Sequence, residues 1–537
     1  MRIDPRFLVE SGPEIFTGSE LLLKGCLETP GGVALLTGYP GSPIAGFFDS
    51  CGEIGPLLHE HGVAAKMANN EALGVAMVNG AQMVGVRAFC AFKSVGLHVA
   101  SDALALGNLA GVPHPTGGAV ICSGDDPWCE STQVPADSRF LFQTLRVPIV
   151  EPSSPQEVKD WIGLSFKLSE QANLYIGYLM TVVLADGGGT VECKPNQWPK
   201  VSHNAKVSVD TANIPFEKIV LLPPRTWRQE LSMDGRFEKL LAAAKELGLN
   251  RVVYGPASGK VPVGIVASGP AYAMLVDALR ELDLLGKVPI LKLGISYPVD
   301  MSLVDELAQR CERIVVIEER RSFIEQQIAE HLPQIRQNHP DSPLGRVELW
   351  GKYFPNDQEG IPHTRGLHTS LLIERLATLF RSIPASASIL NQSRMDQELA
   401  TMTQASSVTL TVPVRTPAFC PGCPHRDSSS ALLEVRKNLA NPEYMQKHYG
   451  RPSVDLLAHG DTGCYTMLMF EPNKALMHNY SGMGLGGGTG AGADPFITNK
   501  QIVFMGDGTF FHSGKLAIAN AIVQNQDITF IILENKT

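Results

Sequence analysis

The sequence has no long hydrophobic run and no apolar stretch at its N-terminus. No apolar run approaches the ~18 residues of a membrane-spanning helix, so we expect no membrane span. The opening MRIDPRFLVE lacks the apolar centre of a secretory signal, so we expect the protein not to be exported. Basic residues are in the minority, and the formal net charge of −9 argues against nucleic acid or an anionic membrane as the main partner.

Cysteine is also scarce, with ten residues in a chain of 537. This number is too small for a disulfide framework, and most of the cysteines are typical of core residues in a reducing compartment, which predicts a cytoplasmic protein. The hydrophobic content of 44% and the charged content of 18% are those of an ordinary globular protein with a large core. The length allows about three or four domains.

Short apolar runs alternate with helical patterns over most of the chain. Examples are the strand pattern RAFCAF and the small-residue helix pattern EALGVAMVNGAQMVG. This alternation predicts an α/β protein built from parallel sheets. The buried strand pattern ITFIIL near the C-terminus would need further strands and helices beside it, so we expect the last domain to be truncated. We predict the following organisation: an α/β domain over 1–190, a connector over 191–261, an α/β domain over 262–384, a polar linker over 385–412 and an α/β domain over 413–537.

The strongest motif lies at the end of the chain. Gly506, Asp507 and Gly508 follow one apolar run (IVFM), and Asn535 follows the next (ITFIIL). A carboxylate and an amide oxygen are hard ligands suited to Mg²⁺. The two glycines let the backbone approach a phosphate, and the start of the following helix attracts anions. The pattern therefore predicts a metal-bound pyrophosphate.

Glu71 opens the small-residue helix after MANN. One interpretation is structural, since an acid at a helix N-terminus interacts favourably with the helix dipole. The other is a buried carboxylic acid that hydrogen-bonds a cofactor nitrogen, which the downstream pyrophosphate motif favours.

Two further strand ends carry polar candidates. Ser42 lies in the turn TGYPGSP, which is either a rigid turn set by Gly and Pro or a site for an anionic substrate group at the carboxyl edge of the sheet. Lys93 and His98 follow the strand RAFCAF and are either surface ion-pairing residues or groups that face a substrate carboxylate.

The run Cys420-Pro-Gly-Cys423 is the clearest cysteine signal, and Cys464 in HGDTGCYT supplies a third thiol. Three thiolates with a fourth ligand would hold an Fe₄S₄ cluster, and no other cysteine has an obvious partner spacing. Zinc is the rival, with His425 as the fourth ligand. A third interpretation is a set of structural thiols that line a cofactor site.

The glycine-rich stretch 481–490 (SGMGLGGGTG) lacks the GK[ST] ending of a nucleotide-binding loop. It predicts a helix start packed tightly under a strand, a position flanking the cofactor, or both.

Several of these motifs occur together in one known family. FCPGCPHR, GDTGCYT, GDGTFFHSG…ILENKT, SGDDPWCEST and KLGISYPVD resemble the alpha (large) subunit of indolepyruvate:ferredoxin oxidoreductase, within the thiamine diphosphate-dependent 2-oxoacid:ferredoxin oxidoreductase superfamily. The resemblance runs from about residue 15 to the end of the sequence.

The resemblance implies several doubly wound, thiamine-enzyme-like domains: a pyrimidine-binding type over 1–190, a transketolase C-terminal-like type over 262–384 and a diphosphate-binding type over 413–537. It also implies a role for each candidate residue. These roles are pyrimidine contact by Glu71, Mg²⁺ binding by Asp507, Asn535 and the carbonyl of Thr537, substrate carboxylate contact near Ser42, and binding of a [4Fe-4S] cluster by Cys420, Cys423 and Cys464.

The implied reaction is oxidative decarboxylation of an aryl 2-oxoacid to its acyl-coenzyme A, with electrons passed through Fe–S clusters to ferredoxin. A beta- or gamma-type small subunit, or a fused domain, and an oligomeric state would accompany it. Two alternatives stay open: a non-oxidative thiamine diphosphate-dependent decarboxylase or synthase, and a zinc-stabilised scaffold without catalysis.

Overall fold

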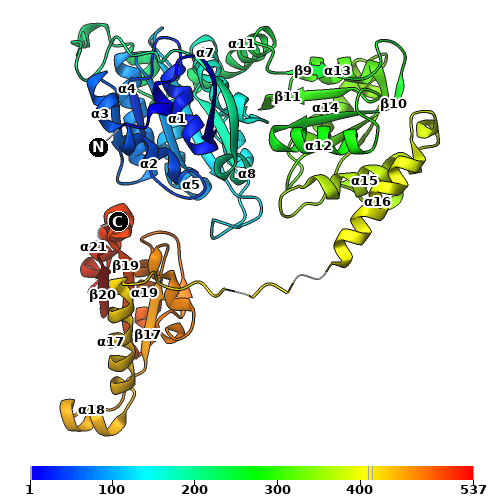
Figure 1. The fold of residues 1–537 in the computed structure, drawn as a ribbon. Coiled ribbons are helices and arrows are strands. Elements are labelled where there is room, and N and C mark those ends of the chain that lie inside the picture. Colours follow the sequence, from blue (N-terminus) through cyan, green and yellow to red (C-terminus); the bar gives the residue numbers. More distant parts are fainter. Residues whose placement is uncertain (1–2, 409–410, 414, 536–537) are drawn as a thin grey trace. The chain divides into compact units, whose positions relative to one another are not determined.

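The computed structural model describes residues 3–408, 411–413 and 415–535, and the chain divides into two compact units, 1–408 and 409–537 (Figure 1). Thr537, predicted as a magnesium ligand, lies outside the described residues. Among the helices that are described, none is both long and apolar enough to cross a membrane.

A seven-stranded sheet forms the first half of the larger unit, in the strand order β12-β6-β7-β5-β4-β2-β3. All neighbouring strands are parallel except β12 and β6. Its strands are β2 (Leu35–Gly38), β3 (Ala64–Met67), β4 (Arg87–Lys93), β5 (Gly118–Asp125), β6 (Ile149–Val150), β7 (Ile176–Thr181) and β12 (Ile295–Tyr297).

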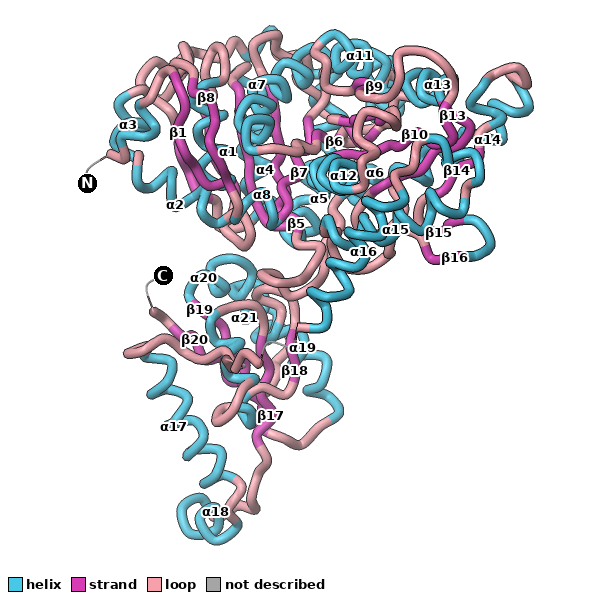
Figure 2. The backbone as a smooth tube through the Cα atoms, turned by 45° about the vertical axis from the view of Figure 1, so that its right-hand side comes forward, coloured by secondary structure: helices cyan, strands magenta, loops and turns pink. Residues whose placement is uncertain are grey.

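Helices cover both faces of this sheet, and Figure 2 shows its strands in magenta among the cyan helices. Successive side chains of a strand point to opposite faces, so Phe89 and Ala91 of β4 enter one hydrophobic cluster while Cys90 and Phe92 enter the other. Burial on both faces explains why the strands are almost continuously apolar. The helices of this half are α1 (Gly18–Glu28), α2 (Ala45–Glu53), α3 (Gly55–Glu60), α4 (Glu71–Val84), α5 (Ser94–Ala110), α6 (Arg139–Thr144), α7 (Pro155–Ala172) and α8 (Val182–Asp186).

A five-stranded sheet in the order β14-β13-β10-β11-β9 forms the second half of the unit. Only β9 runs antiparallel to its neighbour. Val266 and Leu291 of this sheet share one hydrophobic cluster with Cys90 of the first sheet, so the two halves have a common core. The strands are β9 (Arg251–Val253), β10 (Val261–Ser268), β11 (Ile290–Leu293), β13 (Cys311–Ile317) and β14 (Glu348–Trp350). Two strand pairs lie outside the main sheets: β1 (Gly12–Thr17) with β8 (Gly188–Cys193), and β15 (Tyr353–Phe354) with β16 (Gln358–Glu359).

The remaining helices of the larger unit follow β8 in the chain. They are α9 (Phe216–Ile219), α10 (Arg225–Glu230), α11 (Met233–Glu246), α12 (Gly269–Glu281), α13 (Met301–Arg310), α14 (Ile324–Asn338), α15 (Thr369–Ser382) and α16 (Gln392–Ser407). The polar α16 lies within the segment 385–412, which we predict as a linker, and the two compact units meet in the chain inside that segment.

The smaller unit is built on a four-stranded, fully parallel sheet in the order β18-β17-β19-β20. Its core contains Leu456, Tyr465 and Phe504. The strands are β17 (Leu456–Gly460), β18 (Asn479–Tyr480), β19 (Lys500–Gly506) and β20 (Ile528–Leu533), and the helices are α17 (Pro424–Leu439), α18 (Pro442–Tyr449), α19 (Gly486–Ala493), α20 (Asp507–Thr509) and α21 (Lys515–Val523).

The α/β fold class predicted from the sequence is confirmed, since parallel sheets with helices on both faces make up the chain. One element differs from the sequence pattern. The apolar run YIGYLMTVVLADG predicts a single strand, yet the strand ends at Thr181 and residues 182–186 turn into the short helix α8. Apolar runs do not distinguish a buried strand from a buried helix, and here one run contains both.

Candidate active site

The carboxyl ends of parallel strands in the seven-stranded sheet bring three predicted site residues to one edge. Gly38 at the end of β2 pairs with both Met67 of β3 and Ala91 of β4. The residues that follow these strands therefore share the edge at which open α/β sheets bind ligands. They are Ser42 after β2, Glu71 after β3 and Lys93 at the end of β4.

Glu71 is the first residue of α4 and is only 2% exposed. The side chain of Asn70 caps the helix by accepting a hydrogen bond of 2.9 Å from the backbone N–H of Leu73. The helix start also favours the negative charge of Glu71. Helix α5 packs directly against this carboxylate: a Cβ atom added at Gly96 would lie 2.6 Å from Glu71 Oε1. Glu71, the acid predicted to contact the cofactor, is thus buried at the carboxyl edge of the sheet.

Lys93 is 8% exposed and lies in the electrostatic field of Glu71. Burial lowers the pKa of the Lys93 ammonium, and the neighbouring Glu71 opposes that shift. The turn after β2 covers the lysine stem, since a Cβ atom at Gly41 would lie 2.8 Å from Lys93 Cδ. The exposed Ser42 belongs to this turn, whereas His98 lies exposed on α5.

In the smaller unit, the residues of the pyrophosphate motif lie at the carboxyl edge of the sheet. Gly506 at the end of β19 pairs with Leu533 at the end of β20. Asp507 and Asn535 follow these two residues, so both leave the same edge from adjacent strands. Asp507 begins the short helix α20, and its Oδ1 accepts a hydrogen bond of 2.9 Å from the N–H of Gly508. A π-helical turn over Phe510–Gly514 follows at once. Such turns are frequent at functional sites.

Asp461, which the sequence analysis did not select, lies at the centre of this edge. It follows β17 and is completely buried. Its carboxylate accepts hydrogen bonds from the hydroxyl of Tyr465 and, at 3.2 Å, from the N–H of Gly486. Burial raises the pKa of Asp461 to about 6, and the bond from Tyr465 opposes the rise.

The same network reaches the helix of the GDG motif. Tyr465 Oη lies 3.3 Å from Thr509 Oγ1, and Thr509 donates a hydrogen bond of 2.9 Å to the carbonyl of Thr462. Asp461 therefore ties the glycine-rich segment to the loops after β17 and β19. The sequence contained a signal for Asp461, because this aspartate directly follows an apolar strand in the same way as Asp507.

The glycine-rich segment packs closely under the sheet, as one of its two interpretations predicts. A Cβ atom at Gly487, in the first turn of α19, would lie 2.7 Å from the ring of Phe530 and 2.9 Å from Ala517. Only glycine fits this approach, so packing alone accounts for that residue.

The three candidate cluster cysteines all belong to the smaller unit. Cys420 and Cys464 are exposed, and Cys423 is partly buried. A turn joins Cys420 and Cys423, in which the N–H of Cys423 donates a hydrogen bond of 3.1 Å to the carbonyl of Cys420. Among the residues with described positions, no group of three or more His, Cys, Asp or Glu side chains is arranged to hold a metal ion. The cysteines as placed here do not fit an assembled cluster or zinc site.

His425 lies within the electrostatic influence of Asp507, which its position in the sequence did not indicate. It is 3% exposed on α17, and its ring lies edge-on to that of Phe419 with the centroids 5.9 Å apart. Burial lowers the pKa of His425, and the charge of Asp507 opposes the shift. Helix α17 thus brings an imidazole into the field of the candidate magnesium ligand.

Two family descriptions match parts of the chain. The "Indolepyruvate oxidoreductase domain" matches residues 251–358, and the "Thiamine pyrophosphate enzyme, C-terminal TPP binding domain" matches residues 461–537. The indolepyruvate oxidoreductase subunit IorA of Methanothermobacter marburgensis is 28% identical over 544 aligned positions, which cover 100% of this chain and 77% of that relative. The chain is thus similar to the IorA subunits over nearly its whole length. The IorA subunits of Archaeoglobus fulgidus and Pyrococcus abyssi are 28% and 27% identical, with 98% and 97% of this chain and 75% and 74% of those relatives covered.

One solved structure is also similar to this chain. It is the 2-oxoglutarate:ferredoxin oxidoreductase from Magnetococcus marinus with 2-oxoglutarate, coenzyme A and succinyl-CoA bound, with a TM-score of 0.49 at 15% identity. The alignment covers 68% of this chain and 65% of that one. The match to the thiamine pyrophosphate-binding domain starts at Asp461 and includes Asp507 and Asn535.

Proposed function

We propose that this chain is the thiamine diphosphate-dependent subunit of an enzyme that oxidatively decarboxylates an aryl 2-oxoacid of the indolepyruvate kind. The observation that carries the proposal is the position of Asp507 and Asn535. They follow adjacent parallel strands in the part of the chain that matches a thiamine pyrophosphate-binding domain. The substrate class is taken from the names of the IorA relatives.

Asp507 and Asn535 would hold Mg²⁺ on the diphosphate, together with the backbone carbonyl of Thr537. Carboxylate, amide and carbonyl oxygens are the hard ligands that Mg²⁺ prefers, so the donor set fits the ion. Gly506 and Gly508 flank Asp507 and would leave room for phosphate oxygens near the backbone.

Glu71 would hydrogen-bond the aminopyrimidine nitrogen of the cofactor. Its burial under α5 keeps water from the carboxyl group, and a hydrogen bond made away from water is stronger than an exposed one. When bound, thiamine diphosphate supplies the electron sink for loss of CO₂. The task of this chain is to orient the cofactor and to present the Glu71 carboxyl group to its pyrimidine nitrogen.

Lys93 and Ser42 would face the carboxylate of the 2-oxoacid at the same sheet edge as Glu71. The Lys93 ammonium is partly desolvated, and an anion would stabilise its charged form. His98 stays a weaker candidate for this role because it is exposed on α5.

The proposed overall reaction is RCOCOO⁻ + CoA-SH → RCO-S-CoA + CO₂ + H⁺ + 2 e⁻, with ferredoxin as the electron acceptor. A beta- or gamma-type small subunit would complete the enzyme. The resemblance implies that Cys420, Cys423 and Cys464 would bind a [4Fe-4S] cluster. Because these residues do not form a metal-binding group in the described structure, we assign no electron-transfer step to them.

Calorimetry on the complete chain tests the cofactor site. We expect thiamine diphosphate to bind in the presence of Mg²⁺, and Asp507→Ala to weaken binding at least about 100-fold, since it removes the charged ligand of the ion. Asp527→Ala is a matched control, because that aspartate is exposed at the opposite end of β20. Absence of binding to the unmutated chain would favour a scaffold without catalysis.

Turnover by the complex with its small subunit tests the chemistry. Glu71→Ala should lower 2-oxoacid-dependent reduction of an electron acceptor by at least about 100-fold, in the range that acid–base groups contribute. Circular dichroism should stay unchanged. Release of CO₂ and aldehyde without an electron acceptor would instead identify a non-oxidative decarboxylase.

A further inference from the structure

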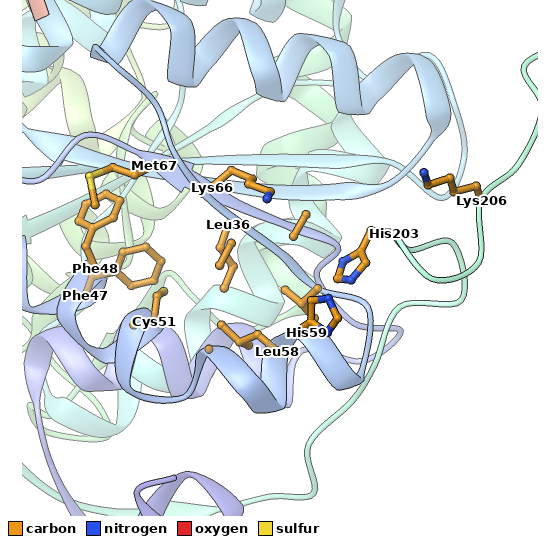
Figure 3. Close-up of a pocket in the computed structure, with 15 residues that line it drawn as sticks. Leu36, Phe47, Phe48, Cys51, Leu58, His59, Lys66, Met67, His203 and Lys206 are labelled. Carbon is orange, nitrogen blue, oxygen red and sulfur yellow. The ribbon is translucent and has the colours of Figure 1, made fainter. Parts of the chain in front are cut away.

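A cavity of about 570 Å³ lies beside β3, the last strand of the seven-stranded sheet (Figure 3). It is lined by β2 and β3, by α2 and α3, and by residues 203 and 206, which follow β8 in the chain. None of the residues used in the proposed function lines it. Its volume is within the ~300–1,000 Å³ typical of small-molecule sites.

The floor of this cavity is apolar. Leu36, Phe47 and Leu58 line it and are almost completely buried, and the ring of Phe48 lies beside that of Phe47. Such a surface favours the burial of an aromatic or aliphatic body.

The rim carries basic side chains. Lys66 comes from β3 and Lys206 from the segment after β8, and the rings of His59 and His203 lie 4.8 Å apart. Among the described residues that line the cavity there is no aspartate or glutamate. The lining therefore carries two lysines and no acidic side chain that would offset them.

Hydrogen bonds fix the rim. The N–H of His203 donates to the carbonyl of Gly62 at 3.1 Å, and the side chain of Asn204 donates to the carbonyls of His59 and Glu60 at 3.0 and 3.1 Å. Within the described structure, His203 Nε2 is buried and has no hydrogen-bond partner. A buried polar atom of this kind is costly unless a partner satisfies it.

We propose that this cavity binds a small amphipathic anion, namely a carboxylate with an aromatic or aliphatic body. The body would pack on Phe47, Phe48 and Leu58. The carboxylate would face Lys66 and Lys206 and accept a hydrogen bond from His203 Nε2. The site lies outside the candidate active site and so adds a second ligand-binding function to the chain.

Calorimetric titration of the complete chain with 4-phenylbutyrate and with its neutral amide tests the proposal. We expect the acid to bind at least ten-fold more tightly than the amide, because only the acid pairs with the lysines. The double variant Lys66→Met/Lys206→Met should reduce this preference to less than three-fold. Equal binding of the two probes to the unmutated chain, or no binding of either, would overturn the proposal.

A cavity-filling variant locates the site. Gly52 lines the cavity on α2, and a Cβ atom added there meets nothing within 4 Å, so Gly52→Trp can place its ring in the cavity without a clash at Cβ. We expect binding of 4-phenylbutyrate to fall at least ten-fold. Gly235→Trp is the matched control, since Gly235 is an exposed glycine of α11 that is equally unobstructed. The Lys93→Met variant should bind as the unmutated chain does. Unchanged binding by Gly52→Trp would place the ligand elsewhere and refute the site.

Discussion

At the scale of single residues, the candidate active site depends on what lies directly against each functional group. Glu71 is buried because α5 approaches it at a glycine, and Lys93 is buried because the turn after β2 covers its stem at another glycine. In both places the missing side chain provides the room that the charged group occupies. Small residues next to the site therefore have a positional role that their chemistry does not reveal.

Gly96→Ala tests this close approach. The added methyl group would lie 2.6 Å from Glu71 Cγ and Oε1, so the carboxylate must move. We expect at least a ten-fold loss of Glu71-dependent turnover, although alanine favours a helix more than glycine by about 0.5–1 kcal/mol. Gly80→Ala on α4 is the control, since its Cβ meets nothing within 4 Å. Unaltered turnover in Gly96→Ala would contradict the proposed role of the carboxylate position.

We predict that Asp125 makes the stability of the larger unit depend on pH. It is 3% exposed and accepts a 2.7 Å hydrogen bond from the N–H of Ser138, and burial raises its pKa to about 7. Between about pH 4 and pH 7 the folded state therefore keeps a proton on Asp125 that the unfolded chain releases. The contribution of Asp125 to the free energy of unfolding is fully present below about pH 4 and is lost as the pH rises through 7. With about 1.4 kcal/mol per pKa unit, the loss is about 4 kcal/mol at most.

Asp125→Asn should remove that loss. Urea unfolding between pH 4 and pH 8 should show that the advantage of the variant over the unmutated chain increases with pH. Glu319, whose pKa burial raises to about 6, still titrates in the variant, so the difference between the two profiles is the quantity to compare. Parallel profiles would show that Asp125 does not control this pH range.

At the scale of elements, the ends of parallel strands place the chemistry. In each unit the functional candidates leave the carboxyl edge of a sheet from neighbouring strands, and a helix begins within a few residues. The start of α4 positions Glu71, and α20 begins at Asp507. The sequence predicted these positions because the strand, turn and helix patterns are local.

Removing the N-terminal cap of α4 tests how much this helix contributes to stability and to the position of Glu71. Asn70→Ala leaves the N–H of Leu73 without its 2.9 Å acceptor and should lower stability by about 1 kcal/mol. Turnover should also fall, because the first turn carries Glu71. Asn70→Ser should recover most of both quantities, since serine is a comparable cap. Equal stability of the alanine and serine variants in thermal denaturation would exclude the capping role.

At the scale of the whole molecule, a buried charge network joins the two halves of the larger unit. Arg139 of α6 donates to Glu318 at 3.0 Å and to the carbonyl of Glu319 at 2.7 Å, both beyond β13 in the second half. Glu318 also accepts three backbone hydrogen bonds of 2.9–3.1 Å at the start of α14. Together with the shared hydrophobic core, these bonds make residues 1–408 one compact unit.

Arg139→Ala should therefore destabilise the larger unit strongly. Removing one partner of a buried ion pair costs about 3–5 kcal/mol, because the remaining carboxylates stay buried without their counter-charge. Calorimetry should show the transition of this unit shifted to lower temperature. Arg346→Ala, which removes an exposed pair with Asp341, should change stability by less than about 0.5 kcal/mol. Similar melting of the two variants would rule out the network as the link between the halves.

The sequence by itself determined the α/β class, the general alternation of strands and helices, and the strand ends at which Glu71, Asp507 and Asn535 occur. These properties follow from short-range patterns of apolar residues, turns and caps. Only the tertiary structure decided that Asp461 joins the glycine-rich segment to the GDG helix, that His425 lies in the field of Asp507, and that a basic-rimmed cavity lies beside β3. Each of these results from contacts between residues distant in the chain, and such contacts depend on how elements pack rather than on any local pattern.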